Sequence, residues 1–142
     1  MSRGKSMELE VFFRERARLF SEGEVAASAD GIDLPLTASI VGSTFHANRK
    51  EDIVMALQLY RNNLGVESYA RTEIVAFHGT EPVEGRAQAI VSYRNVNDQG
   101  AELDRFEASF ICRQVPGGWR IVQADSVTDG TSLRFLSGLP LT

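Results

Sequence analysis

Three side chains in the second half of the chain have the types and spacing that acid–base chemistry needs. Asp104, Asp125 and Tyr93 each fall, by the two-residue alternation of an extended chain, on the apolar side of a predicted strand. An enclosed carboxylate is suited to transferring protons, and an enclosed tyrosine can donate a hydrogen bond to a developing oxyanion. The three residues are therefore the candidate catalytic set. The alternative is that both carboxylates are solvated near strand ends and that Tyr93 is a core residue with a hydrated hydroxyl.

The alternation is clearest in residues 104–113. Phe106 and Phe110 share one face with Asp104, whereas Arg105 and Glu107 lie on the other, so the first face should point towards the core. On the last predicted strand the inner set is Trp119, Ile121, Gln123 and Asp125. We expect these strands to present several aromatic and a few polar side chains to one interior space.

Other residues of chemical interest give weaker signals. His78 stands at a strand end before a turn, where histidine is usually at the surface, and it is a candidate only for the mouth of a pocket. No Glu or Cys stands at ligand spacing from either histidine, so neither a metal site nor a cofactor is expected. Cys112 lies in mid-strand on the apolar face, which indicates an unreactive buried thiol rather than a nucleophile.

The first half of the chain should supply the helices that cover these strands. Residues 7–20 carry apolar side chains at helical spacing, and a short second helix should end near Asp30. Residues 36–41 and 43–47 predict a hairpin. A third helix should follow Asn48, with its apolar stripe formed by Ile53, Leu57, Tyr60 and Leu64.

Four long extended segments follow, over residues 69–78, 85–95, 104–115 and 119–127, and turn-forming residues link them. Such short links predict an antiparallel meander. The tail, residues 128–142, is rich in Gly and Ser and also contains Phe135 and several leucines, and the pattern does not place it. The expected organisation is a single domain over residues 1–142, with a core of about 7–127.

Composition narrows the classes of partner. The 142 residues carry a formal net charge of −4 without a basic cluster, which argues against binding nucleic acid. No segment has the apolar length of a membrane span, and no signal peptide is visible at the start. Cys112 is the only cysteine, so an intrachain disulfide is excluded. These features fit a cytoplasmic protein in a reducing compartment.

The order of helices and strands, together with the closing hairpin, resembles a known superfamily. An aromatic-rich strand that includes Phe106 and Phe110 leads through a short turn to Gly118-Trp119-Arg120-Ile121. This arrangement resembles the NTF2-like superfamily, which includes SnoaL-like cyclases and ketosteroid isomerases. The resemblance implies an α+β cone, in which N-terminal helices pack in the concave face of a curved, mostly antiparallel sheet. It also implies a pocket at the open end and, commonly, dimerisation through the outer sheet face.

The pocket that the resemblance implies would be lined mainly by aromatic side chains from the helices and the inner strand faces. The expected lining residues are Phe12, Phe13, Tyr60, Phe106, Phe110, Trp119, Gln123 and His78. The isomerase activity is not transferred, because residues 36–41 contain no carboxylate and the first helix has no tyrosine. A hydrolase site built from an Asp–Arg–Asp set is weakened because Arg105 should point outwards.

The outer face of the predicted sheet carries Ile90, Ile111 and Val122 among polar residues. An apolar spot with a polar rim is typical of an interface, although scattered surface aliphatics are also normal. Together with the resemblance, this pattern favours a homodimer.

Three functions remain open on the sequence. The first is a small-molecule pocket in a SnoaL-like domain with no assigned catalysis. The second is a lyase, isomerase or hydrolase that acts on a small apolar compound through carboxylate acid–base chemistry. The third is a non-catalytic module for dimerisation or protein interaction. The sequence does not decide whether the protein is an enzyme.

Overall fold

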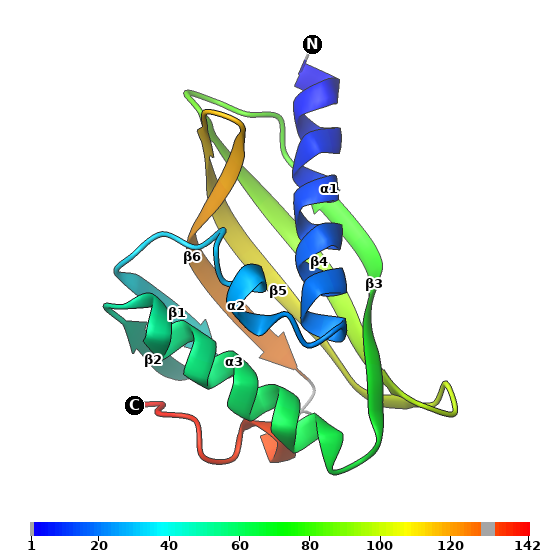
Figure 1. The fold of residues 1–142 in the computed structure, drawn as a ribbon. Helices are drawn as coiled ribbons and strands as arrows, with labels where there is room; N and C mark the ends of the chain where they lie inside the picture. The colour runs from blue at the N-terminus through cyan, green and yellow to red at the C-terminus, as the bar shows by residue number, and fades with distance from the viewer. Residues whose placement is uncertain (1, 129–132) are drawn as a thin grey trace.

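The computed structural model describes residues 2–128 and 133–142, with side chains from residue 8 onwards, and it is an α+β fold with three helices on one face of a curved sheet (Figure 1). The helices are α1 (Ser2–Ser21), α2 (Val25–Ser28) and α3 (Lys50–Gly65). The strands are β1 (Leu36–Ile40), β2 (Ser43–Ala47), β3 (Tyr69–Gly79), β4 (Arg86–Asn97), β5 (Glu102–Val115) and β6 (Gly118–Thr128). A short 3₁₀ helix, η1 (Leu133–Leu136), belongs to the tail.

The six strands form one sheet in the order β2-β1-β6-β5-β4-β3. The four long strands are antiparallel neighbours in chain order, which confirms the predicted meander. The β1–β2 hairpin joins this meander through a parallel pairing of β1 with β6. The predicted fold class, helices in the concave face of a curved and mostly antiparallel sheet, is therefore confirmed.

The first helix lies along the concave face because its apolar stripe can be buried only there. Leu9 and Phe13 are fully buried, and the Phe13 ring packs 4.8 Å from Phe110 of β5 and 5.9 Å from Phe77 of β3, between ring centroids. Arg14 points the other way and pairs with Glu10 at 2.8 Å. Figure 1 shows α1 lying along the sheet, and the buried contacts of Leu9 and Phe13 show that the side assigned to the core is the side that packs there.

The last strand contains a β-bulge that the sequence pattern did not indicate. Ile111 stands opposite Gln123, whereas the next residue, Cys112, stands opposite Ile121, so Val122 is one residue too many on β6. A bulge of this kind reverses the alternation beyond it. Trp119 and Ile121 are buried as predicted, but Gln123 and Asp125 are exposed. The prediction that Gln123 and Asp125 face the interior is therefore wrong.

The tail, which the sequence did not place, closes the wide end of the fold. Phe135 is buried, and the side chain of Asn63 on α3 donates hydrogen bonds to the carbonyls of Phe135 and Ser137. Thr142 and Thr44 of β2 exchange two backbone hydrogen bonds of 2.9 Å. The tail consequently bridges α3 and the edge of the hairpin.

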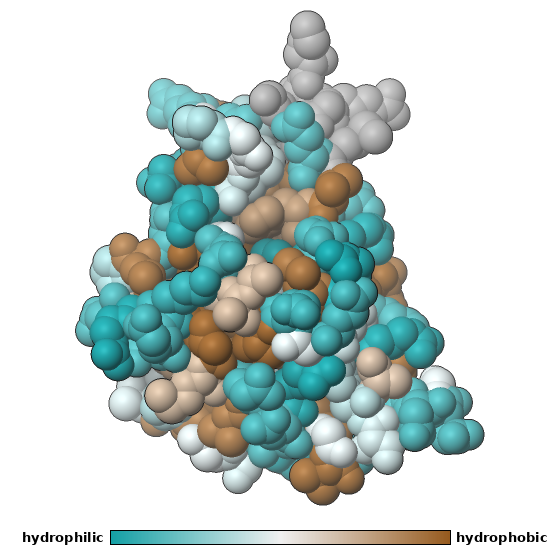
Figure 2. All heavy atoms as spheres, viewed as in Figure 1, coloured by the Kyte–Doolittle hydropathy of each residue, from teal (hydrophilic) through white to brown (hydrophobic). Residues whose placement is uncertain are grey.

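The outside of the helical layer is mostly hydrophilic. In the view of Figure 2, apolar side chains gather near the centre of this face, where α2 and α3 meet, and polar side chains surround them. No helix in the described part of the chain has both the length and the apolar composition needed to cross a membrane.

Candidate functional site

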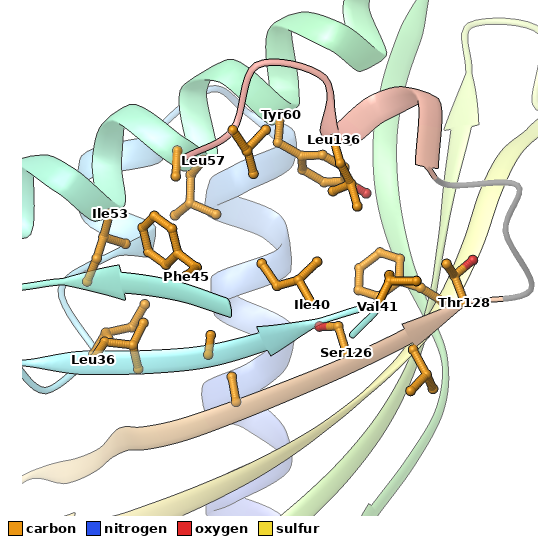
Figure 3. Close-up of a pocket in the computed structure, with 17 residues that line it drawn as sticks. Leu36, Ile40, Val41, Phe45, Ile53, Leu57, Tyr60, Ser126, Thr128 and Leu136 are labelled. Carbon is orange, nitrogen blue, oxygen red and sulfur yellow. The ribbon is translucent and has the colours of Figure 1, made fainter. Parts of the chain in front are cut away.

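An apolar cavity of about 220 Å³ lies under α3, between the β1–β2 hairpin, β6 and the tail (Figure 3). Ile53 and Leu57 project into it from α3, and Ile40 and Phe45 project from the hairpin. Leu136 of η1 lies beside Tyr60 on the wall of the cavity. We call this space the apolar compartment, because almost every side chain on its wall is hydrocarbon.

A second cavity of about 180 Å³ lies deeper in the cone, between α1, α2, α3 and the inner face of the long strands. It is called the inner compartment. Four residues line both cavities, namely Leu57, Tyr60, Phe106 and Ser126. The compartments therefore adjoin, and these four side chains form the boundary between them.

The inner compartment is lined by a cation, the half-buried Arg16, which also lines an outer groove between α1 and the β5–β6 turn. Arg16 enters from α1, and its Nε donates a 3.0 Å hydrogen bond to the carbonyl of Ser28 at the end of α2. Burial lowers the pKa of Arg16 from its ordinary value, and the nearby Tyr93 and Cys112 partly offset this effect. Within the described residues Arg16 forms no ion pair.

Tyr93 lies beside this cation. Its ring stacks on Phe106, with 5.0 Å between centroids and 22° between planes. Burial is the main reason that the pKa of Tyr93 rises to about 12, so the hydroxyl is protonated at neutral pH and can donate a hydrogen bond. The Tyr93 hydroxyl has no hydrogen-bond partner among the side chains and backbone groups that the structure describes.

Asp104 is almost fully buried, but it lines neither compartment. Its carboxylate accepts hydrogen bonds from Tyr60 at 3.2 Å and from Asn95 at 2.6 Å, and Asn95 also donates to the Tyr60 hydroxyl at 2.8 Å. Burial and the adjacent Asp104 raise the pKa of Tyr60 well above its ordinary value. Asp104 thus lies behind Tyr60 and Asn95, and its hydrogen bonds fix these two side chains in the wall of the inner compartment.

The other predicted pocket residues separate into three groups. Tyr60, Phe106 and Phe110 line the inner compartment, as does Tyr93. Phe13 is part of the packed core, and Phe12 and Trp119 line an outer groove between α1 and the β5–β6 turn. Gln123, Asp125 and His78 are exposed and border neither compartment.

Sequence reasoning missed Arg16, although a signal was present. Arg16 stands four residues after Phe12, three after Phe13 and four before Phe20, which places it inside the apolar stripe of α1. A charge at such a position is either a snorkelling side chain or a buried group with a task. The helical periodicity could therefore have singled out Arg16 as a pocket residue.

The chain matches a known family over most of its length. Residues 7–129 match the family model described as NTF2-like protein (DUF6841). The chain belongs to this NTF2-like family. No curated protein matches the chain.

Solved structures agree on the fold at low sequence identity. An NTF2-like protein with a cystatin-like fold from Novosphingobium aromaticivorans superposes with a TM-score of 0.74 at 16% identity, covering 89% of this chain and 84% of the other. ActVI-ORFA from Streptomyces coelicolor gives 0.69 at 13% identity, covering 89% and 96%. A putative calcium/calmodulin dependent protein kinase II association domain from Xanthomonas campestris gives 0.65 at 12% identity, covering 87% and 86%. These likenesses establish the NTF2-like fold.

Residues that would hold a metal are absent from the site. Within residues 8–128 and 133–142, no group of three or more His, Cys, Asp or Glu side chains is close enough to bind an ion. Cys112 is buried, and burial raises the pKa of its thiol to about 12. Such a thiol is a poor nucleophile at neutral pH.

Proposed function

We propose that this NTF2-like domain binds a small, mainly apolar molecule inside the cone. The observation that carries the proposal is the apolar compartment of about 220 Å³, which adjoins a second space with polar groups. Apolar cavities of about 150 Å³ stay dry and take up a benzene-sized guest, so a space of this size can hold one ring or a short chain. A concave apolar site with few polar groups is typical of small-molecule recognition.

Catalysis is left out of this proposal. Carboxylate acid–base chemistry needs a carboxylate in contact with the ligand, and neither compartment has one on its wall in the described part of the chain. Asp104 lies behind the wall, and Asp125 lies on the outside of the sheet. The acid–base alternative would therefore need a rearrangement of the wall around Tyr60 and Asn95.

Toluene is a suitable neutral probe, because its volume fits the apolar compartment. Binding should shift the NMR signals of Leu57, Phe106 and Leu136, and it should raise the midpoint of thermal unfolding. Ala56→Leu adds three carbons to the cavity wall and should weaken toluene binding about tenfold or more. Ala101→Leu makes the same change in an exposed turn and should leave binding unchanged.

Two results would contradict the proposal. One is the absence of any toluene-dependent shift around the apolar compartment. The other is unchanged affinity in the Ala56→Leu variant.

A homodimer through the outer sheet face is a second proposal. Ile90 on β4 is 36% exposed, and Val75 on β3 is 42% exposed. Ile111 and Val122 are half-buried there. The proposal is supported by these aliphatics within a polar rim and by the likeness to a protein titled an association domain. The oligomeric state in solution tests it.

We also propose that the protein is located in the cytoplasm. It rests on the single, buried cysteine, which suits a reducing compartment. Fractionation of the native host followed by immunodetection would test it.

A further inference from the structure

The Arg16 guanidinium has hydrogen-bond donors that no described residue accepts from. Its Nε is occupied by the carbonyl of Ser28, but its two terminal nitrogens make no hydrogen bond to any described residue. Every fully enclosed side-chain nitrogen or oxygen in the described part of the chain has a partner. The terminal nitrogens and the equally unpartnered Tyr93 hydroxyl therefore border open space. Arg16 lines both the outer groove and the inner compartment, and the inner compartment is the space that it shares with Tyr93.

The half-buried Arg16 has few partners on the side that faces the inner compartment. A guanidinium removed from bulk water is stabilised only if an anion or several hydrogen bonds replace its hydration. Here one backbone carbonyl does so, and no carboxylate lines the compartment among the described residues. Asp104, a buried carboxylate on β5, is already bonded to Tyr60 and Asn95. A bound anion would supply the missing partner.

The free donors also indicate the shape of that anion. The two terminal nitrogens of a guanidinium form a planar fork that matches the two oxygens of a carboxylate. The Tyr93 hydroxyl, which is protonated, can donate a third hydrogen bond to the same group. Phe106, which stacks on Tyr93, and Leu57 line both compartments. They therefore form a continuous apolar wall between the polar end and the apolar compartment.

We propose that the inner compartment binds the carboxylate of a small apolar monocarboxylic acid, with Arg16 and Tyr93 as its donors and the hydrocarbon part directed towards the apolar compartment. The inference rests on the proposed small-molecule function and names the class of ligand. The compartments of about 180 and 220 Å³ accommodate a carboxylate with a short linker and one ring-sized group.

The test compares 3-phenylpropanoate with its neutral analogue 3-phenylpropanamide, by calorimetry and by the side-chain Nε–H NMR signal of Arg16 in the full chain. The wild-type protein should bind the carboxylate about tenfold or more tightly than the amide, as expected for a charge-assisted fork. Arg16→Gln should abolish this preference and leave amide binding unchanged. Tyr93→Phe should weaken carboxylate binding several-fold.

Arg16→Gln is a conservative choice, because the glutamine Nε2 occupies the position of the arginine Nε and can keep the hydrogen bond to Ser28. The matched control is Arg14→Gln, which removes the same charge from the outer side of the same helix. It should leave the preference for the carboxylate intact. Without ligand, the Arg16→Gln protein should unfold at the same or a higher temperature than the wild type.

The outcomes separate the two proposals. Equal binding of carboxylate and amide in the wild type would overturn the role of Arg16 and leave small-molecule binding standing. Persistence of the preference in Arg16→Gln would also overturn it. If neither compound binds at millimolar concentration, the carboxylate site fails, and toluene binding decides separately whether the proposed function stands.

Discussion

The hydroxyl of Tyr60 on α3 donates a 3.2 Å hydrogen bond to the buried carboxylate of Asp104 on β5. This contact connects the helix that roofs the cavities with the sheet that forms their floor. Asn95 of β4 completes the network by donating to both residues, and the Thr72 hydroxyl donates to Asn95 at 2.5 Å. The network therefore holds the polar side of the inner compartment in one arrangement.

Tyr60→Phe should lower the free energy of unfolding by about 1–3 kcal/mol, because it leaves a buried carboxylate short of a donor. Tyr93→Phe is the matched control, since it removes a buried hydroxyl that has no partner in the described protein. It should change stability by no more than about 0.5 kcal/mol. Urea unfolding followed by circular dichroism measures both values. Equal losses in the two variants would contradict a structural role for the Tyr60–Asp104 contact.

The sequence predicted the helices and strands of this fold better than it predicted which way their side chains point. Helix periodicity and strand alternation respond to a buried face, so they located the three helices and the four long strands to within a few residues. Asp104, Tyr93 and Phe110 also face inwards as the alternation predicted. These positions lie before the β6 bulge, where the two-residue rhythm is unbroken.

The features that the sequence did not predict arise from tertiary structure. The extra residue at Val122 turns the side chains of Gln123 and Asp125 to the outer face of the sheet. No glycine or turn-forming residue next to Val122 indicates this bulge in the sequence. Burial of Asp104 inside a hydrogen-bond network depends on Tyr60 and Asn95, which are 44 and 9 residues away in the chain. Local patterns contain no information about such contacts.

The pH dependence of stability should show the pairing of Asp33 with Arg113 and Arg120. Asp33 precedes the hairpin, and its carboxylate lies 2.5 Å from the Nε atoms of both arginines. The hydrogen bond from Arg113 is the main cause that lowers the pKa of Asp33 below its ordinary value of 3.8. A lowered pKa stabilises the fold above the ordinary value, and this contribution is lost as the pH falls through the folded-state pKa.

Asp33→Asn should accordingly be less stable than the wild type at pH 7, and the difference should shrink once the pH falls below about 4. Thermal unfolding between pH 7 and pH 3 measures it. Asp98→Asn, at an exposed turn without an ion pair in the described structure, should show little pH-dependent difference. A gap between wild type and Asp33→Asn that stays constant down to pH 3 would contradict the assignment.

The tail should contribute measurably to stability through Phe135. This ring is 1% exposed, contacts Arg134 at 4.2 Å from the ring centroid and packs with Phe20 and Leu64. Phe135→Ala should cost about 3–5 kcal/mol, the usual range for a buried phenylalanine. Leu133→Ala, at a position that is 52% exposed in the same 3₁₀ helix, should cost about 0.5 kcal/mol or less. Similar effects of both variants in urea unfolding would show that the tail does not pack on the domain in solution.

The proposed dimer predicts a defined response to charge on the outer sheet face. Light scattering at micromolar concentration should give the wild type twice the 15.7 kDa chain mass. Ile90→Lys should weaken the dimer about tenfold or more, because an isologous contact places two such lysines in the same buried patch. Val11→Lys on α1, where the valine is 66% exposed on the helical side, should leave the mass unchanged. A monomeric wild type, or an Ile90→Lys variant that remains fully dimeric, would exclude this face as the interface.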